Sequence, residues 1–235
     1  METGLEYAEI AMRNKLQNIQ IVANNLANLN TTGFKRGLAF SEVFDIEKQN
    51  ITSELTDFTE GVFVQTNDPL NAAIAGNAFF TVKTEDGEHL TKNGDFLIDK
   101  EGYLANREGY RVLAQNGEVN LQEHLFDGNK TITISKNGEI KADDLIIAKL
   151  KIQSVNDNKK LVKADGQRFF TEDKIYNIVD DTNFQIHHGY LESSNTNAIL
   201  EMQAMIQLQK DYEAAQKMIT SLDDTLSQTN EIGEV

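Results

Sequence analysis

The chain has 235 residues, enough for one ordinary domain or two small ones. Its 22 basic and 37 acidic side chains give a formal net charge of −15, which excludes nucleic acid and anionic membranes as expected partners. There is no cysteine, so disulfides, thiolate chemistry and cysteine-ligated zinc are excluded too, and the single proline permits long uninterrupted helices and strands.

We expect no cleaved signal peptide and no membrane insertion. Charged and polar residues interrupt the apolar ones throughout residues 1–23. No stretch approaches the roughly 20 consecutive apolar residues that a transmembrane helix needs. The sequence therefore predicts a chain that is soluble at synthesis and does not follow the general secretory route, which leaves specialised export open.

Apolar residues near the N-terminus recur in steps of three and four and predict an amphipathic helix of about 28 residues. They are Leu5, Ala8, Met12, Ile19, Val22, Leu26 and Leu29. Gly33, which follows Thr31 and Thr32, would end this helix in the left-handed conformation.

The middle of the chain has a different character. Turn dipeptides such as Asp86-Gly87, Asn116-Gly117 and Asn137-Gly138 separate short apolar or alternating runs. Short strands joined by such turns are typical of an antiparallel β domain. The run from Leu145 to Ile152 is the longest strand that the pattern predicts.

Residues Asn197 to Thr229 contain neither glycine nor proline and predict a second amphipathic helix. Ile199 and Met202 begin its apolar stripe. The stripe continues through Met205, Leu208, Tyr212, Ala215, Ile219, Leu222 and Leu226. The polar cluster Ser193-Ser194-Asn195 would supply N-cap oxygens for this helix.

The predicted fold class is α+β, with a central antiparallel β domain between two long terminal helices that pair as a coiled coil. We divide the chain into an N-terminal helix (1–36), an extended connector (37–68), the β domain (69–186) and a C-terminal helix (187–235). Two paired helices leave much of each apolar stripe exposed, which favours further protein partners. The alternative is a monomer whose helices pack onto its own sheet.

The chemistry-bearing residues do not predict an enzyme, a cofactor or a metal site. The four histidines lack the spacing of a zinc-binding helix, and we expect His187-His188 in a solvated turn before Gly189. Residues Leu97 to Glu108 partly match a calcium loop, but Leu97 replaces the first carboxylate, so an acidic hairpin turn is predicted instead. An enzyme on a β scaffold and a soluble binding module remain alternatives; the enzyme would require a pocket with convergent titratable groups.

Three asparagines within five residues, Asn24, Asn25 and Asn28, are unusual near a helix end because asparagine is a poor helix former. Their amides can both donate and accept hydrogen bonds, which suits contacts with backbone groups of this or a neighbouring chain. The alternative is a frayed helix end with asparagine caps.

The run from Ala23 to Lys35 resembles the N-terminal signature of the bacterial flagellar basal-body rod and hook proteins. Residues Gly189–Asn195, continued by Glu201–Glu213, resemble that family's C-terminal signature, and Asp68–Phe80 resembles a segment that opens its β domain. The matches occur in the family's order. The sequence departs from the family pattern at Asn71, where aspartate is usual, at Lys92, where arginine is usual, and at Thr196.

The short segment between Gly37 and Glu60 and the run from Ile219 to Asp224 favour the proximal-rod type over the distal-rod type. The resemblance implies a structural subunit, exported by the flagellar type III apparatus, that stacks helically with copies of itself and with other rod proteins in a rod crossing the periplasm. The terminal helices would form the inner tube and the β domain would pack outside it, without any cofactor.

The resemblance and the helical stripes together predict a set of assembly residues. Apolar members would lie in packed helix contacts, and asparagines would make polar contacts between segments. The set is Asn24, Asn25, Leu26, Asn28, Thr31, Gly33, Phe34, Leu191, Glu192, Ser194, Asn195, Met202, Met205, Ile206 and Tyr212.

Overall fold

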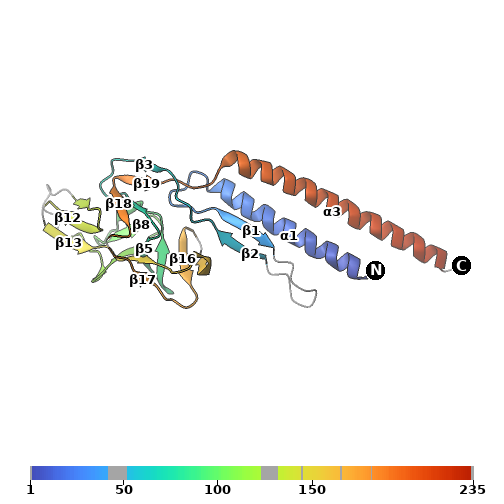
Figure 1. Cartoon of the computed structure of the whole chain (residues 1–235), viewed down its shortest axis with the longest axis horizontal. Coiled ribbons are helices and arrows are strands. Elements are labelled where there is room, and N and C mark those ends of the chain that lie inside the picture. Colours follow the sequence, from blue (N-terminus) through green and yellow to red (C-terminus); the bar gives the residue numbers. More distant parts are fainter. Residues whose placement is uncertain are drawn as a thin grey trace. The chain divides into compact units, whose positions relative to one another are not determined.

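The computed structural model describes residues 2–41, 52–122, 132–143, 145–164, 166–180 and 182–233. The chain forms two compact units, each taken by itself below (Figure 1). The helical unit comprises Met1–Leu29, Gly37–Asp57 and Thr196–Val235. The β unit comprises Asn30–Arg36 and Phe58–Asn195.

The helical unit contains the two long helices that the apolar periodicity predicts, α1 (Glu2–Ala27) and α3 (Ala198–Gly233). They lie side by side in Figure 1. Strands β1 (Gly37–Ser41) and β2 (Thr52–Thr56) form an antiparallel hairpin that contacts α1.

The predicted coiled coil is wrong. A coiled coil buries the repeating apolar positions of both helices against each other. Here the α3 stripe residues from Met205 to Ile219 are only half-buried, and among the described side chains of α3 only Glu201 is buried. Glu201 meets the equally buried Asn25 of α1, so one buried contact between the helices is polar. The helices pair without an interdigitated apolar seam.

The helix ends differ from the prediction in their capping. Asn197, rather than the preceding cluster Ser193–Asn195, caps α3: its Oδ1 accepts hydrogen bonds from the backbone N–H groups of Ile199 at 3.0 Å and Leu200 at 3.3 Å. At the other end of the chain α1 stops at Ala27, before Gly33. Gly33 does have the predicted left-handed conformation, with φ +70°. It lies in a turn next to Asn93, and a Cβ atom on Gly33 would lie 2.5 Å from the Asn93 backbone nitrogen, so only glycine fits there.

The β unit is antiparallel throughout its described strand pairs, as predicted. Its strands are β3 (Phe63–Gln65), β4 (Ala72–Ala75), β5 (Phe79–Thr84), β6 (Gly87–Thr91), β7 (Phe96–Ile98), β8 (Leu104–Asn106), β9 (Arg111–Ala114), β10 (Gly117–Glu118), β11 (Ile132–Ile134), β12 (Glu139–Ala142), β13 (Leu145–Lys149), β14 (Ile152–Ser154), β15 (Leu161–Lys163), β16 (Arg168–Thr171), β17 (Asn177–Ile178), β18 (Gln185–His188) and β19 (Tyr190–Glu192). A 3-10 turn, η1, covers Asn158–Lys160.

Within the described residues the largest sheet has ten strands and runs in the order β15-β16-β6-β5-β9-β8-β7, with β10 on β9 and with β14 joining β5 to β17. A three-stranded sheet, β11-β12-β13, and the pairs β18-β4 and β19-β3 complete the unit. The predicted Asx-Gly dipeptides lie at the turns between β5 and β6, β9 and β10, and β11 and β12, where Gly87, Gly117 and Gly138 all have positive φ.

The predicted long strand from Leu145 to Ile152 is wrong, because two sheets divide it. Strand β13 pairs with β12, whereas β14 pairs with β5 and β17. The change occurs at Leu150, which is buried and donates its N–H to Gly138 O at 2.8 Å. Lys151 then donates to Leu113 O at 2.9 Å, and the chain passes into the larger sheet.

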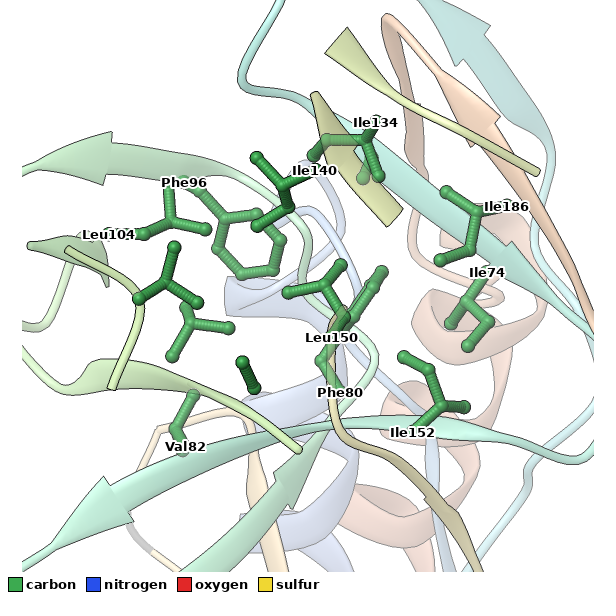
Figure 2. Packing of buried hydrophobic residues seen from close by; sticks show 14 of the residues in the cluster. Ile74, Phe80, Val82, Phe96, Leu104, Ile134, Ile140, Leu150, Ile152 and Ile186 are labelled. Carbon is green, nitrogen blue, oxygen red and sulfur yellow. The ribbon is translucent and has the colours of Figure 1, made fainter. Parts of the chain in front are cut away.

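The core of the β unit lies where these sheets face one another. The rings of Phe80 and Phe96 pack edge to face with their centroids 5.1 Å apart. Figure 2 shows these two side chains among isoleucines from five other strands. The labelled side chains are Ile74, Phe80, Val82, Phe96, Leu104, Ile134, Ile140, Leu150, Ile152 and Ile186, and all are buried. Residues far apart in the sequence therefore share one apolar cluster.

Candidate assembly site

Asn25 is the best-connected of the predicted asparagines. Its side chain is buried in the helical unit, where Nδ2 donates to Gly37 O and Oδ1 accepts from Gly37 N, both at 2.9 Å. Nδ2 also lies 3.3 Å from Oε2 of Glu201. One amide therefore ties the end of α1 to the start of β1 and to the first turn of α3.

A second polar contact joins the helices further along. Lys15 Nζ lies 2.9 Å from Asp211 Oδ2, and both side chains are partly exposed. The hydrogen bond from Lys15, followed by that from Gln207, holds the pKa of the Asp211 carboxyl below its usual value. Because solvent and salt screen an exposed pair of this kind, it contributes little to stability.

The predicted apolar residues of the helices fall into two groups. Leu26, Met205 and Tyr212 are half-buried. Met202 and Ile206 are 52% and 54% exposed, and Ile199, which lies on the same stripe, is 69% exposed. Together Ile199, Met202 and Ile206 form an apolar strip along the first turns of α3, in steps of three and four, which we call the α3 strip.

The remaining N-terminal site residues differ in their contacts. Asn24 is exposed, and its backbone oxygen accepts a hydrogen bond from Asn28 Nδ2 at 2.9 Å. In the β unit, Thr31 is half-buried and its carbonyl accepts from Phe34 N at 3.3 Å. The ring of Phe34 is buried, with Lys163 Nζ 4.3 Å from its centroid.

The C-terminal motif lies on and just after β19, which pairs with β3. Leu191 and Glu192 are buried, and Ser194 is half-buried. Asn195 accepts a hydrogen bond from Arg36 N at 2.8 Å through Oδ1 and donates through Nδ2 to Thr59 O at 3.1 Å. The two predicted motifs therefore meet in the β unit, since Gly33 N also donates to Glu192 O at 2.7 Å.

Buried charge is the feature of this site that sequence reasoning missed. Lys35 and Glu192 form an ion pair of 2.6 Å with almost no solvent exposure on either side chain. Lys92 is buried nearby, and Glu201 is buried in the helical unit. Lys35 lies in the N-terminal motif and Glu192 in the C-terminal motif, so the motifs mark both residues. Nothing in the neighbouring sequence indicates that either side chain is buried.

The chemical alternatives find little support. In the described part of the chain, no group of three or more histidine, aspartate or glutamate side chains is placed to hold a metal ion. The predicted turn at His187-His188 is wrong, because both residues lie in β18 opposite Ala73 and Ala72. The acidic hairpin turn is confirmed: Asp99 Oδ1 accepts from the N–H groups of Glu101 and Tyr103, both at 2.9 Å, between β7 and β8.

Neither α1 nor α3 combines the length and the apolar character that crossing a bilayer would require. One depression of the β unit is lined in part by charged side chains that are engaged with each other, such as Lys83 with Glu118 at 2.6 Å. Arg111 adds contacts with Glu118 and Glu101 at the neighbouring hairpin. Each of these four side chains is therefore already engaged in an ion pair.

His89 makes the stability of the β unit depend on pH. Burial, followed by the charge of Arg168, lowers its pKa; Asp86 acts in the opposite direction, and Lys174 lowers it further. Because the unfolded chain then binds the proton more tightly, the unit should lose stability as the pH falls below about 6.5. Denaturant titrations from pH 7.5 to 5 should show this loss.

The matched variant is His89→Phe, which cannot titrate and preserves the ring stacked on Phe170 at 5.3 Å. Its stability should fall less than that of the native chain over the same pH range. Equal falls in both proteins would show that His89 is not the group responsible.

Comparison with known families identifies three stretches in the same order. The Flagella basal body rod protein family model matches residues 5–35, the Flagellar hook protein FlgE/F/G D1 domain model matches 73–142, and the Flagellar basal body rod FlgEFG protein C-terminal model matches 187–232. Together these stretches cover more than half of the chain.

Similar proteins align over nearly their whole length. The flagellar basal-body rod protein FlgF of Rhizobium meliloti is 27% identical over 98% of both chains. FlgF of Caulobacter vibrioides is 27% identical over 86% of this chain and 85% of its own. FlgG of Agrobacterium fabrum is 28% identical over 95% of this chain and 97% of its own. The chain therefore belongs to the family of flagellar basal-body rod proteins, structural components of the basal body rather than enzymes.

Proposed function

We propose that this rod subunit assembles helically through its terminal helices. The α3 strip is the observation that carries the proposal, since three large apolar side chains on successive turns of one helix are more than half exposed. An exposed apolar surface on a helix favours burial against another helix. A surface of this kind on one subunit and its complement on the next generate an open helical assembly.

We further propose that the terminal helices within residues 1–36 and 187–235 form the inner tube of the rod, with the β unit outside it. Asn25 and Asn195 support this division. Each satisfies backbone groups of its own chain, Asn25 at Gly37 within the helical unit and Asn195 at Arg36 within the β unit. The half-buried Leu26, Met205 and Tyr212 would become more fully buried in the assembled rod.

Relatives named FlgF and FlgG both align with the chain, and we propose the FlgF type, the proximal-rod member. The short Gly37–Glu60 segment and the Ile219–Asp224 run support this assignment. We also propose export by the flagellar type III apparatus to the periplasmic rod. A host lacking a working export apparatus should then retain the chain inside the cell, and release at the native rate from such a host would contradict this part.

The assembly proposal is tested by replacing Met202 and Ile206 together with aspartate. Both side chains are exposed in the isolated chain, so the fold should be retained with a stability change within about 1 kcal/mol. In the rod the new carboxylates would be buried against apolar neighbours, which costs several kcal/mol. Motility and the recovery of intact rods from cells should be lost.

The control adds the same charge elsewhere on α3, at the exposed positions Gln203 and Gln216. Cells that carry these control variants should swim normally if the α3 strip is the assembly surface of α3. Normal motility of the Met202/Ile206 variant would instead favour a subunit whose helices need no partner. Motility lost equally in both sets would assign the effect to charge on α3 in general.

A further inference from the structure

Three short segments of the β unit are bound together where the chain passes into and out of it. The first is Asn30–Arg36, the second Thr59–Val62, and the third is β19 with the residues that follow it. Backbone hydrogen bonds join them: Gly33 N donates to Glu192 O at 2.7 Å, and Ser193 N donates to Val62 O at 2.9 Å. More than 150 residues separate the first segment from the third.

Buried charges hold the same three segments. Lys35 Nζ donates to Glu192 Oε1 and to Thr59 O, both at 2.6 Å. Glu192 Oε1 also accepts from Gly61 N at 2.8 Å. A single carboxylate oxygen therefore joins all three segments, whereas the other oxygen, Oε2, is buried without a hydrogen-bond partner in the described structure.

Two further charged side chains, the buried Lys92 and the exposed Glu60, meet at Gly76. Lys92 Nζ donates to Gly76 O at 2.7 Å and to Ile74 O at 3.3 Å, and its side chain is buried. Glu60 Oε1 accepts from Gly76 N at 2.6 Å. Glu60 therefore binds the N–H group of Gly76, and Lys92 binds its carbonyl oxygen. With Lys35 and Glu192 these make two lysines and two glutamates, so the formal charges of the four side chains sum to zero.

We propose that Lys35, Glu192, Lys92 and Glu60 form a closure lock, in which residues 30–36, 59–62 and 190–195 open and close as one cooperative unit controlled by the charge balance of these four groups. The lock is a conformational device within the β unit and does not depend on the rod function proposed above. A buried ion is costly without its partner, so loss of Glu192 would release Lys35 and the backbone it holds together.

The charge of Lys92 controls the closed state. Burial is the main cause that lowers its pKa to about 8; Glu192 raises it, Lys35 lowers it and Glu60 raises it. In the open state, exposed to water, Lys92 should titrate near the ordinary lysine value of about 10.4. The open form therefore binds more protons between these two values, and closure is favoured as the pH rises through them.

Hydrogen–deuterium exchange on the full-length native chain tests the lock. After correction for the chemical exchange rate at each pH, the opening equilibrium at Gly33, Gly61 and Ser193 should fall about tenfold between pH 7 and pH 9. The Lys92→Met variant should lose this pH dependence. The same slope in that variant, or no slope in the native chain, would overturn the proposal.

The second arm changes the charge balance directly. Glu192→Gln retains the size of the side chain but removes the buried carboxylate, so exchange at Gly33, Gly61 and Ser193 should rise together by at least tenfold, with the β5–β6 amides unchanged. Adding Lys35→Met removes the unbalanced cation and should recover most of the protection. The control Lys83→Met breaks only the exposed pair with Glu118 and should have no effect at these amides.

A purely structural role for Glu192 would give a different result. Exchange would then rise only at β19 or equally over the whole β unit, and the Lys35→Met/Glu192→Gln double variant would be no better protected than the single one. Either result contradicts the lock. If Glu192→Gln does not fold, the pH series on the native chain and on Lys92→Met decides the question.

Discussion

Replacing Phe80 by alanine should lower the free energy of unfolding of the β unit by about 3–5 kcal/mol, because a buried phenyl ring is lost and the surrounding core cannot collapse fully into its place. Phe80 has no solvent exposure and packs edge to face on Phe96. It also lies on β5, opposite Thr91 of β6 and Ile152 of β14. The measurement is urea denaturation followed by tyrosine fluorescence.

Phe170→Ala provides the matched control. Phe170 lies on β16 in the same sheet but is only half-buried, with its ring on His89. Its removal exposes less new apolar surface and should cost about 1–2 kcal/mol. Equal losses for the two phenylalanines would mean that the core around Phe80 relaxes to fill the space, contrary to the packing in Figure 2.

Replacing Asn25 by alanine should destabilise the helical unit by about 3 kcal/mol, because each unsatisfied buried polar group costs about 1–3 kcal/mol. The change removes both hydrogen bonds to Gly37 and the contact with Glu201, which stays buried. Circular dichroism at 222 nm, which reports mainly on the two helices, should show a lower melting temperature.

Asn28→Ala serves as the control for Asn25. The Asn28 side chain donates to Asn24 O within its own helical turn and is half-buried. Its removal should cost about 1 kcal/mol, the net contribution of a typical hydrogen bond. If Asn28→Ala lowered the stability as much as Asn25→Ala, the contacts of Asn25 with Gly37 and Glu201 would not explain the effect of replacing Asn25.

The helices could be predicted from the sequence because their apolar period is local and long. Their manner of pairing could not. The stripe predicted apolar contacts, but Asn25 and Glu201 occupy the buried position between the helices, and 176 residues separate them. A polar residue in one helix becomes compatible with burial only through a partner elsewhere, and periodicity contains no information about such partners.

The β unit illustrates the same limit. Hairpins such as β5–β6 follow from the Asp86-Gly87 turn, since both strands and the turn are adjacent in sequence. The pairing of β14 with β5 joins Ile152 to Phe80, and no turn signal predicts it. That non-local pairing is what divides the predicted strand at Leu150.

The candidate site was predicted by motif and not by chemistry. The resemblance selected Asn25, Glu192 and Asn195, which all make specific contacts in the structure. It gave no reason to expect that Lys35 would be the partner of Glu192, 157 residues away. Charged residues are usually exposed, so nothing in the composition indicates that the fold buries this ion pair.

Strand β5 has a consequence for the speed of folding. Its two halves face different partners along one edge, with Phe79 and Phe80 beside β14 and Val82 and Lys83 beside β9, while β6 occupies the other edge. The hairpin with β6 can form early, but the edge is completed only when a strand about 70 residues away arrives. Closing a loop of this length costs conformational entropy before any native contact compensates for it, so this step is slow. The β unit should therefore fold slowly for its size. The part of the β5 edge at Phe79 and Phe80 should stay unpaired for much of that time.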